Sequence, residues 1–232
     1  MITEAWTQMD RPHVGQLSGF GGAGLFHFFG VRGFSWSDLE KIGPAARLKQ
    51  VHGHQVIRVE EKPLSSSLLG EGDALISDQI GIFLTVSTAD CVPLLFFNPS
   101  RRAIGAAHAG WRGSVEQIGP QVVKALLEAF GGRAEDLHVA IGPSIGPCCY
   151  EVGREVLDRL SAMPGEILRP HGPDHARLDL AALNRHQLLA IGVHPERIYS
   201  ASLCTACHVE RFYSYRREGG LRGNMISGLK LT

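Results

Sequence analysis

The sequence predicts a single domain of the α/β class, of the α+β type, in which short strands outnumber helices. Glycines separate short apolar segments of strand length along most of the chain, and only a few longer segments carry a helical apolar face. Neither an internal repeat nor a linker composition divides the 232 residues. We therefore expect one domain over residues 1–232, with an irregular N-terminal segment over residues 1–24.

The first half of the chain is predicted to be mostly strand. Residues 55–60 alternate apolar and polar side chains, which is typical of a half-buried strand, whereas residues 92–97 are apolar and indicate a buried one. The serine-containing segment 62–70 is expected to be a loop, and residues 98–100 a turn. Strands are predicted at residues 25–31, 55–60, 73–77, 82–86, 92–97 and 103–107.

The clearest helix is predicted to begin at Ser114. Ser114 and Gln117 have the spacing of a capping box, and two glycines at 131–132 are expected to end the helix. The apolar face consists of Ile118, Val122, Leu126 and Phe130.

The second half alternates strands with two further helices. A strand is expected at 137–141, followed by a proline- and glycine-rich loop at 142–147. Apolar spacing predicts one helix through Val152, Val156, Leu157 and Leu160, and another that begins near Asp179 and carries Leu180, Leu183, Leu188 and Leu189. Strands are expected at 212–215 and 225–231.

Composition excludes several function classes. The formal net charge is zero, so we expect binding to neither nucleic acid nor a membrane surface. No signal-peptide pattern and no membrane-spanning apolar run is visible, and an odd number of cysteines, five, argues against a disulfide framework. We therefore expect a cytoplasmic protein.

Two histidines and one cysteine carry the most informative chemistry. His52, Cys91 and His108 form a three-ligand set for zinc that leaves a fourth position open, which is the catalytic arrangement. Taken singly, Cys91 and His108 are more often buried core residues, and His52 competes with the nearby His54. The position of Cys91 and His108 at or near strand–loop boundaries favours a shared site.

Arg112 follows His108 in a stretch flanked by Gly110 and Gly113. The glycines allow the backbone to turn closely beside a bound group, and a guanidinium suits phosphate or carboxylate. A surface arginine without a site role is an equally supported interpretation.

Other short matches lack the context that their chemistry requires. A G-x-G-x-x-G match at 19–24 neither follows a strand nor precedes a helix. Cys204-Thr-Ala-Cys207-His208 fits haem attachment, which requires export, and His208-Val-Glu210 reverses the order of the zinc deaminase signature. We interpret these matches as coincidences. The adjacent cysteines Cys148 and Cys149 have two possible interpretations, side chains that pack a loop or a redox-sensitive pair.

Six motifs in one order carry a family resemblance. They are Lys49-Gln-Val-His52-Gly, Gly72-Asp73-Ala-Leu, Thr88-Ala-Asp90-Cys91-Val-Pro, His108-Ala-Gly-Trp-Arg-Gly, Ile141-Gly-Pro-Ser-Ile-Gly and Phe212-Tyr-Ser-Tyr-Arg-Arg217. Over nearly the whole chain, the sequence resembles the YfiH-type family, whose members are labelled polyphenol oxidase, laccase domain-containing or purine nucleoside phosphorylase. Members usually have a longer segment where this chain runs from Val31 to Leu48.

The resemblance implies a fold, a metal and an activity. The fold would be a mixed β-sheet core with helices packed on the outer faces, cysteine-hydrolase-like and similar to bacterial toxins that use a Cys–His pair. Zn²⁺ would be held by His52, Cys91 and His108, with copper the less favoured metal. The activity would be phosphorolysis of adenosine, inosine, guanosine and methylthioadenosine, with deamination of adenosine as a further reaction. The partners would be a purine nucleoside and phosphate, with the chain a monomer or a weak homo-oligomer.

Further residues receive roles by their position in these motifs. Arg112, and also Arg32 or Arg216, would hold the phosphate through paired hydrogen bonds. Asp73 and Asp90 are the candidate acids for proton transfer. For Asp90 we slightly favour the alternative of a turn cap that shapes the loop presenting Cys91.

Three other function classes remain open at this stage. In a metal-free hydrolase or amidase, Cys91 would be the nucleophile and His108 its base. A copper oxidase acting on phenols would need paired histidine clusters, which eleven scattered histidines do not supply. A non-enzymatic zinc-binding or partner-binding module would close the fourth metal position, for example with Cys148 or Cys149.

Overall fold

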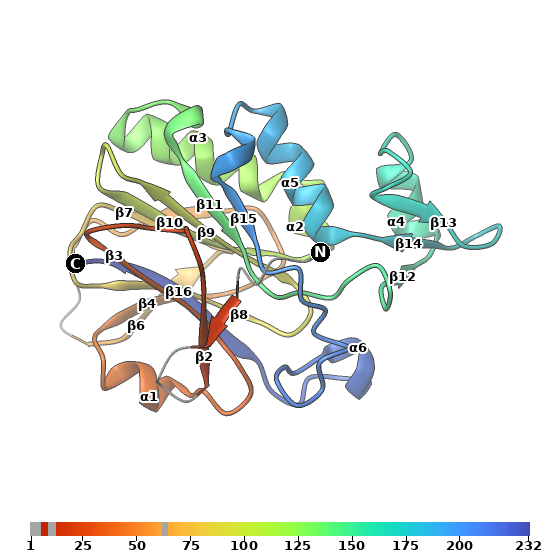
Figure 1. Cartoon of the computed structure of the whole chain (residues 1–232), viewed down its shortest axis with the longest axis horizontal. Helices are drawn as coiled ribbons and strands as arrows, with labels where there is room; N and C mark the ends of the chain where they lie inside the picture. The colour runs from red at the N-terminus through yellow and green to blue at the C-terminus, as the bar shows by residue number, and fades with distance from the viewer. Residues whose placement is uncertain (1–5, 9–12, 62–64) are drawn as a thin grey trace.

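Two β-sheets packed face to face form the centre of the molecule (Figure 1). The computed structural model describes residues 6–8, 13–61 and 65–232. The first sheet has seven strands in the order β1 (Trp6–Gln8), β2 (Val14–Leu17), β3 (Leu25–Gly30), β16 (Met225–Leu231), β8 (Phe83–Thr88), β4 (Ala45–Lys49) and β6 (Ser67–Glu71). The second has six strands in the order β15 (Ile198–Ser200), β11 (His138–Ile141), β9 (Val92–Asn98), β10 (Ala103–Ala109), β7 (Ala74–Ser77) and β5 (Val56–Arg58).

Both sheets are mixed, as the family resemblance implies. In the six-stranded sheet β5 runs parallel to β7 and β15 parallel to β11, while β9, β10, β7 and β11 pair antiparallel. In the seven-stranded sheet β4 is parallel to both β6 and β8, and the remaining pairs are antiparallel. The result is a mixed α/β fold with several sheets and few helices.

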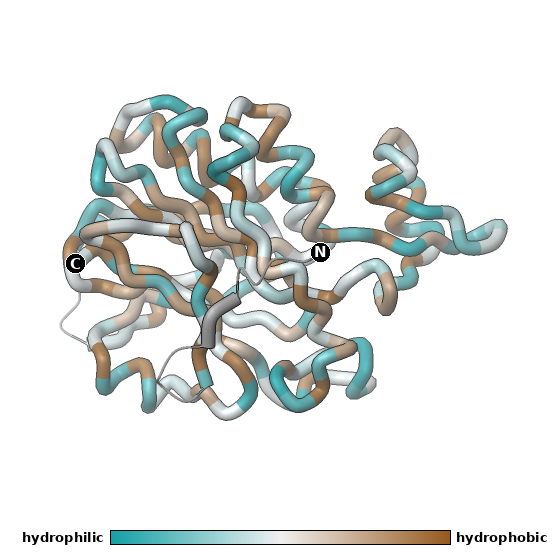
Figure 2. Tube along the Cα trace, in the orientation of Figure 1, coloured by the Kyte–Doolittle hydropathy of each residue, from teal (hydrophilic) through white to brown (hydrophobic). Residues whose placement is uncertain are grey.

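Strand β9 shows how the sequence specifies the layers. Its side chains point alternately to opposite faces, so Leu94 and Phe96 pack toward the helices while Leu95 and Phe97 pack against the other sheet. Burying each such side chain stabilises the fold by about 1.5–3 kcal/mol, which explains why β9 is apolar on both faces. Figure 2 shows the same pattern as apolar colour along the central strands and alternating colours around the helices.

Helices cover the outer face of the six-stranded sheet. Helices α2 (Trp111–Val115), α3 (Ile118–Phe130) and α5 (Leu180–Ala190) lie there, and the apolar face predicted for α3 is confirmed, with Ile118, Val122 and Leu126 fully buried. The short helix α1 (Trp36–Glu40) packs on the far side of the seven-stranded sheet. The remaining helices are α4 (Arg154–Leu160), α6 (Tyr215–Glu218) and two short 3₁₀ turns at Ala134–Asp136 and Pro195–Arg197.

A small lobe projects from one side of the sandwich (Figure 1). It consists of α4 and a three-stranded sheet in the order β12 (Glu151–Val152), β14 (Ala176–Leu178) and β13 (Leu168–Pro170). Val152 and Val156 belong to the same apolar cluster as the helix-covered face of β9. Within the described residues no helix is long and apolar enough to cross a membrane.

Several sequence expectations about local structure are wrong. Val152, which was expected within a helix, lies in β12, and α4 begins only at Arg154. The capping box at Ser114 is absent, because Ser114 is buried and its hydroxyl accepts a hydrogen bond from Asn184; α3 instead begins after Gln117, which has a left-handed backbone. The segment predicted to be irregular over residues 1–24 contains β1 and β2, which extend the sheet edge beside β3; its residues 1–5 and 9–12 lie outside the described part of the chain.

Two further errors concern a loop and a strand. The predicted loop 62–70 contains most of β6, which forms by pairing with β4; residues 62–64 lie outside the described part of the chain. The predicted strand 212–215 is irregular over residues 212–214, and Tyr215 begins α6, whose start is capped by the Ser214 hydroxyl. The 19–24 glycine motif follows β2, contrary to the expectation that no strand precedes it. It leads into β3 rather than a helix, as expected, so the helix that a dinucleotide motif requires is not there.

Candidate metal and catalytic site

The candidate site lies at one end of the six-stranded sheet. Cys91 immediately precedes β9, and His108 is the penultimate residue of β10, where it pairs with Pro93 in the antiparallel register. Asp73 immediately precedes β7, whose first residue pairs with Ala107 of β10. Strand register therefore brings together three side chains that are far apart in the sequence.

The loop between β4 and β5 adds His52 to this sheet end. The nitrogen and sulfur donors of His52, Cys91 and His108 all lie within 4.8 Å of one another. The two imidazole rings meet edge to face, with centroids 4.7 Å apart. His108 is buried whereas His52 is exposed, so the donor set faces solvent on its His52 side.

Asp73 hydrogen-bonds both the His108 ring and the backbone of the loop that carries His52. Its side chain is fully buried, and Oδ1 accepts a hydrogen bond of 2.8 Å from His108 Nδ1. Hydrogen bonds from the backbone amides of Val51, His52 and Gly53 complete the carboxylate's partners, at 3.2, 3.0 and 2.7 Å. A carboxylate that holds Nδ1–H leaves Nε2 free as a metal ligand or base.

The same contacts fix an uncommon backbone conformation. His52 has a φ of 59°, which only a small share of non-glycine residues adopt. The three amide hydrogen bonds to Asp73 hold the loop in this shape, so Asp73 is a positioning residue for both histidines. The sequence analysis named Asp73 as a candidate acid; the structure places it behind His108.

The electrostatics of the metal-free site favour a charged pair. Burial opposes ionisation of Cys91, but hydrogen bonds and charge from His108 and His52 lower the pKa of its thiol to about 7. Burial likewise opposes protonation of His108, yet Asp73 and Cys91 raise the pKa of its imidazole to about 9. The pKa of Asp73 is lowered, because the hydrogen bonds from His108 and Gly53 outweigh its burial.

Two glycines allow the chain to pass close to the donors. A Cβ at Gly110 would lie 3.0 Å from His52 Nδ1 and 3.2 Å from Cys91 Sγ. A Cβ at Gly113 would lie 2.6 Å from the Gly53 carbonyl oxygen, so α2 packs directly on the His52 loop. The predicted role of these glycines in a close approach is supported by these distances.

Asp90 shapes the loop that presents Cys91. It has a φ of 88°, and its carboxylate accepts hydrogen bonds from Thr205 Oγ1 at 2.6 Å, Ser214 Oγ at 3.0 Å and the Arg216 amide at 2.8 Å. These contacts support the turn-cap interpretation over that of an acid.

Tyr150 is a neighbour of the site that no sequence pattern predicted. Burial raises the pKa of Tyr150 to about 12, and the charge of Cys91 adds to the rise while those of Arg216 and Arg112 oppose it. The phenol therefore stays protonated at neutral pH. The guanidinium of Arg216 lies 5.1 Å from the Tyr150 ring centroid, and its Nη1 donates to the Glu151 carbonyl.

The other two predicted arginines differ in their availability. Arg112 lies over the Trp111 ring and contacts Glu155 at 3.0 Å with its side chain 56% exposed, so a ligand displaces only a weak surface ion pair. Arg32 is bound between Glu218, the Phe212 carbonyl and the Tyr213 ring. A phosphate at Arg32 would compete with Glu218, and its role as a phosphate ligand stays a prediction.

Comparison with known proteins assigns the family. Residues 37–232 match the family model described as multi-copper polyphenol oxidoreductase laccase. The chain belongs to this family. All three members of the donor set lie within the matched residues.

Relatives of the laccase-family chain carry phosphorylase names. It is 38% identical over 190 residues to "Purine nucleoside phosphorylase YlmD" of Geobacillus stearothermophilus, covering 77% of this chain and 69% of that protein. It is 41% identical over 182 residues to "Purine nucleoside phosphorylase" of Deinococcus radiodurans, covering 78% and 67%. The solved structure of Bacillus licheniformis hypothetical protein YfiH superposes with a TM-score of 0.90 at 25% identity, covering 98% and 99% of the two chains.

Proposed function

We propose that this laccase-family chain is a zinc-dependent purine nucleoside phosphorylase. The observation that carries the proposal is the His52–Cys91–His108 donor set, which supplies three ligands at a solvent-facing sheet end. Relatives at 38% and 41% identity are named purine nucleoside phosphorylase, which supports the same reaction class.

The donor set fits zinc. Zn²⁺ binds thiolate and imidazole in a tetrahedron with bonds of about 2.0–2.3 Å, which demands donors as close as those of this site. The Cys91 thiol ionises easily, which is the form that a metal requires. Asp73 holds Nδ1–H of His108, so a bound metal would take the place of the proton on Nε2. Copper remains the less favoured metal, because the described residues place only this one pair of histidines together with a thiol.

Zn²⁺, when bound, would supply a Lewis acid that orients a phosphate oxygen and offsets negative charge. The chain's own residues would do the rest. Asp73 keeps the His108 imidazole in one tautomer, and Arg112 and Arg216 place positive charge around Tyr150 beside the site. The protonated Tyr150 hydroxyl is a hydrogen-bond donor to a bound oxygen or base nitrogen.

The proposed reaction exchanges one bond at the ribose. A phosphate oxygen forms a bond to C1′, and the C1′–N9 bond breaks with its electron pair going to the purine. The purine takes up the proton that the attacking hydrogen phosphate releases. The products are a free purine and ribose 1-phosphate, or 5-methylthioribose 1-phosphate when the substrate is methylthioadenosine. Adenosine, inosine, guanosine and methylthioadenosine share the atoms involved, so the proposal covers all of them; deamination of adenosine, which needs water rather than phosphate, remains a separate prediction.

Product analysis of adenosine with and without phosphate tests the proposal. Adenine and ribose 1-phosphate should form only with phosphate. The Cys91→Ala and His108→Ala variants should lose the zinc bound at the His52–Cys91–His108 donors, together with turnover, while remaining folded. Inosine formation independent of phosphate would replace phosphorolysis with deamination. Full turnover in a folded variant that has lost this zinc would refute the metal's role.

A second candidate is a metal-free cysteine hydrolase, and the charged pair favours it. Cys91, His108 and Asp73 stand in the order of nucleophile, base and orienting carboxylate, and Cys91 has a lowered pKa of about 7. Stoichiometric alkylation of Cys91 in the protein as purified supports the hydrolase. Protection from alkylation that disappears when a chelator removes zinc supports the phosphorylase.

A further inference from the structure

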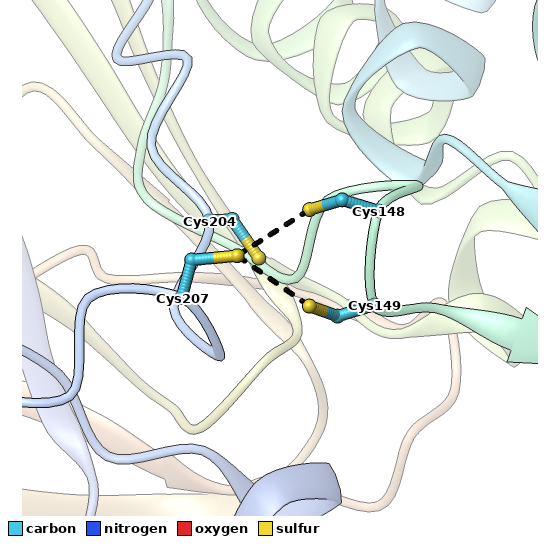
Figure 3. Close-up of side chains that lie close together, drawn as sticks. All are labelled: Cys148, Cys149, Cys204 and Cys207. Atoms are coloured by element: carbon cyan, nitrogen blue, oxygen red, sulfur yellow. Dashed lines mark hydrogen bonds between the residues drawn. The ribbon is translucent and has the colours of Figure 1, made fainter.

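Four cysteines form a second cluster away from the His–Cys–His donors (Figure 3). Cys148 and Cys149 lie in the turn that follows the 142–147 loop, and Cys204 and Cys207 lie in the segment between β15 and α6. All four sulfur atoms lie within 4.8 Å of one another. Tertiary structure therefore joins two pairs that the sequence analysis treated as unrelated.

The spacing of the sulfur atoms distinguishes a metal site from disulfides. Cys207 Sγ lies 3.6 Å from Cys148 Sγ and 3.5 Å from Cys149 Sγ. A disulfide requires about 2.05 Å between sulfurs. Four thiolates around Zn²⁺ at about 2.3 Å lie about 3.8 Å apart by tetrahedral geometry, close to the observed spacing. All five cysteines of the chain are free thiols in this structure.

Backbone hydrogen bonds hold the two cysteine-containing loops together, independently of the sulfur atoms. The amide of Ser144 donates to the Leu203 carbonyl at 3.2 Å, and the amide of Thr205 donates to the Ser144 carbonyl at 3.0 Å. These bonds hold the two loops side by side, with Ser144 and Cys204 in a parallel bridge. The site thus requires little rearrangement to accept an ion.

Backbone amides also orient the sulfur atom of Cys204. The Gly146 amide donates to Cys204 Sγ at 3.2 Å, and the Cys207 amide is a further backbone donor to the same sulfur. A two-residue gap between cysteines, with an amide of the second directed at the first sulfur, is a ligand spacing found in structural zinc sites. Hydrogen bonds to ligand atoms orient them and tune the site.

Two arginines place positive charge on the cluster loops. Arg177 Nη1 donates to the Cys148 carbonyl at 3.2 Å, and Arg217 Nη1 donates to the carbonyls of Thr205 and Ala206 at 2.9 and 3.1 Å. The same guanidinium groups also pair with carboxylates, Arg177 with Glu151 at 3.3 Å and Arg217 with Glu218 at 2.9 Å. They therefore connect the two cluster loops to neighbouring side chains.

We propose that Cys148, Cys149, Cys204 and Cys207 bind a second zinc ion with a structural role. All four tetrahedral positions are filled by protein, which leaves no place for substrate or water. This site is distinct from the His52–Cys91–His108 donors and does not depend on the proposed phosphorylase activity.

The structural ion stabilises the loop that presents Cys91. Thr205, which lies between two of the cluster cysteines, donates to Asp90 Oδ1 at 2.6 Å, and the Ile145 amide of the opposite loop donates to the Asp90 carbonyl at 2.9 Å. Asp90 precedes Cys91 in the chain. Loss of the ion should therefore lower thermal stability and weaken activity without removing the residues that contact substrate.

Zinc content of the purified full-length chain tests the proposal. Elemental analysis and native mass spectrometry should find two zinc ions per chain in the wild type and one in Cys207→Ser. The control variant Cys91→Ser should also retain one ion, the one in the four-cysteine cluster. A cobalt-substituted Cys91→Ser protein should show a strong thiolate-to-cobalt charge-transfer absorption that Cys207→Ser abolishes in the same background.

The outcomes separate this site from the proposed function. One zinc ion that is lost with Cys207→Ser but retained with Cys91→Ser supports the structural site and contradicts the phosphorylase metal. Unchanged zinc content in both Cys207→Ser and Cys149→Ser would overturn the structural site, as would a mass that shows a disulfide within the cluster of the protein as purified. Should Cys207→Ser not fold, the zinc content of Cys91→Ser decides: one ion supports the proposal and none overturns it.

Discussion

Replacing Asp73 with asparagine tests the positioning of both histidines in one step. The carboxylate accepts four hydrogen bonds: His108 Nδ1 and the His52 amide reach Oδ1, and the Val51 and Gly53 amides reach Oδ2. Asparagine has only one oxygen. If the asparagine NH₂ takes the place of Oδ2, it faces the amide N–H groups of Val51 and Gly53. If it takes the place of Oδ1, it faces the His52 amide and His108 Nδ1, and His108 then avoids the clash only as the tautomer whose Nε2 carries the proton.

The magnitude follows from these contacts. Each buried donor left without an acceptor costs about 1–3 kcal/mol, so two such donors should lower the free energy of unfolding of the metal-free protein by about 2–6 kcal/mol. Removing the carboxylate that hydrogen-bonds the other ring nitrogen of a metal-bound histidine typically lowers metal affinity by about 10–100-fold. We expect a loss of zinc affinity in this range from Asp73→Asn.

Chelator competition and denaturant unfolding measure the two effects. Zinc affinity is followed with a chromophoric chelator, and the Cys91→Ser variant defines the signal that does not come from this site. Asp78→Asn, at an exposed carboxylate just after β7, is the matched control and should change neither quantity. Zinc affinity in Asp73→Asn within about threefold of the wild type would refute the positioning argument.

Three further changes test other parts of the structure. Burial lowers the pKa of His27 to about 4, so between pH 6.5 and 4 the unfolded state binds more protons than the folded state. The free energy of unfolding of the wild type should therefore drop by about 3 kcal/mol as the pH falls across this window, and this drop should be absent in His27→Gln. Gly110 has a φ of −72°, which alanine accepts, so Gly110→Ala acts only through its new methyl group. That methyl group would contact His52 and Cys91 and should weaken zinc binding at the His–Cys–His donors by about tenfold or more. The control Gly165→Ala, whose methyl group meets no atom within 4 Å, should leave zinc binding unchanged. Arg112→Ala should raise the KM for phosphate by about tenfold, whereas Arg159→Ala, which removes a comparable exposed ion pair with a glutamate, should leave it unchanged; equal KM values in the two variants would contradict a phosphate role.

Much of the core could be predicted from local pattern. The apolar segment 92–97, the helical face from Ile118 and the strand at 225–231 each bury side chains whose spacing matches the element they form. The expectations that failed depend on distant partners: β6 forms by pairing with β4, and Ser114 is buried against Asn184 instead of capping a helix. A contact with a residue far away in the chain does not produce a periodic apolar pattern in the local sequence, so local patterns could not predict it.

The same division applies to the two cysteine-containing sites. Residue type alone identified His52, Cys91 and His108, because two imidazoles and a thiol in glycine-rich motifs are unusual near apolar strands. The antiparallel register of β9 and β10 decided that Cys91 meets His108, and the register of β7 and β10 placed Asp73 behind His108. The loop between β4 and β5 brought His52 to them. The four-cysteine cluster goes further, since its two halves are more than fifty residues apart and only loop packing reveals them as one ligand set. The sequence by itself determined which donors the chain carries; the tertiary structure decided which of them meet, because a metal site depends on distances of a few ångströms that chain order does not encode.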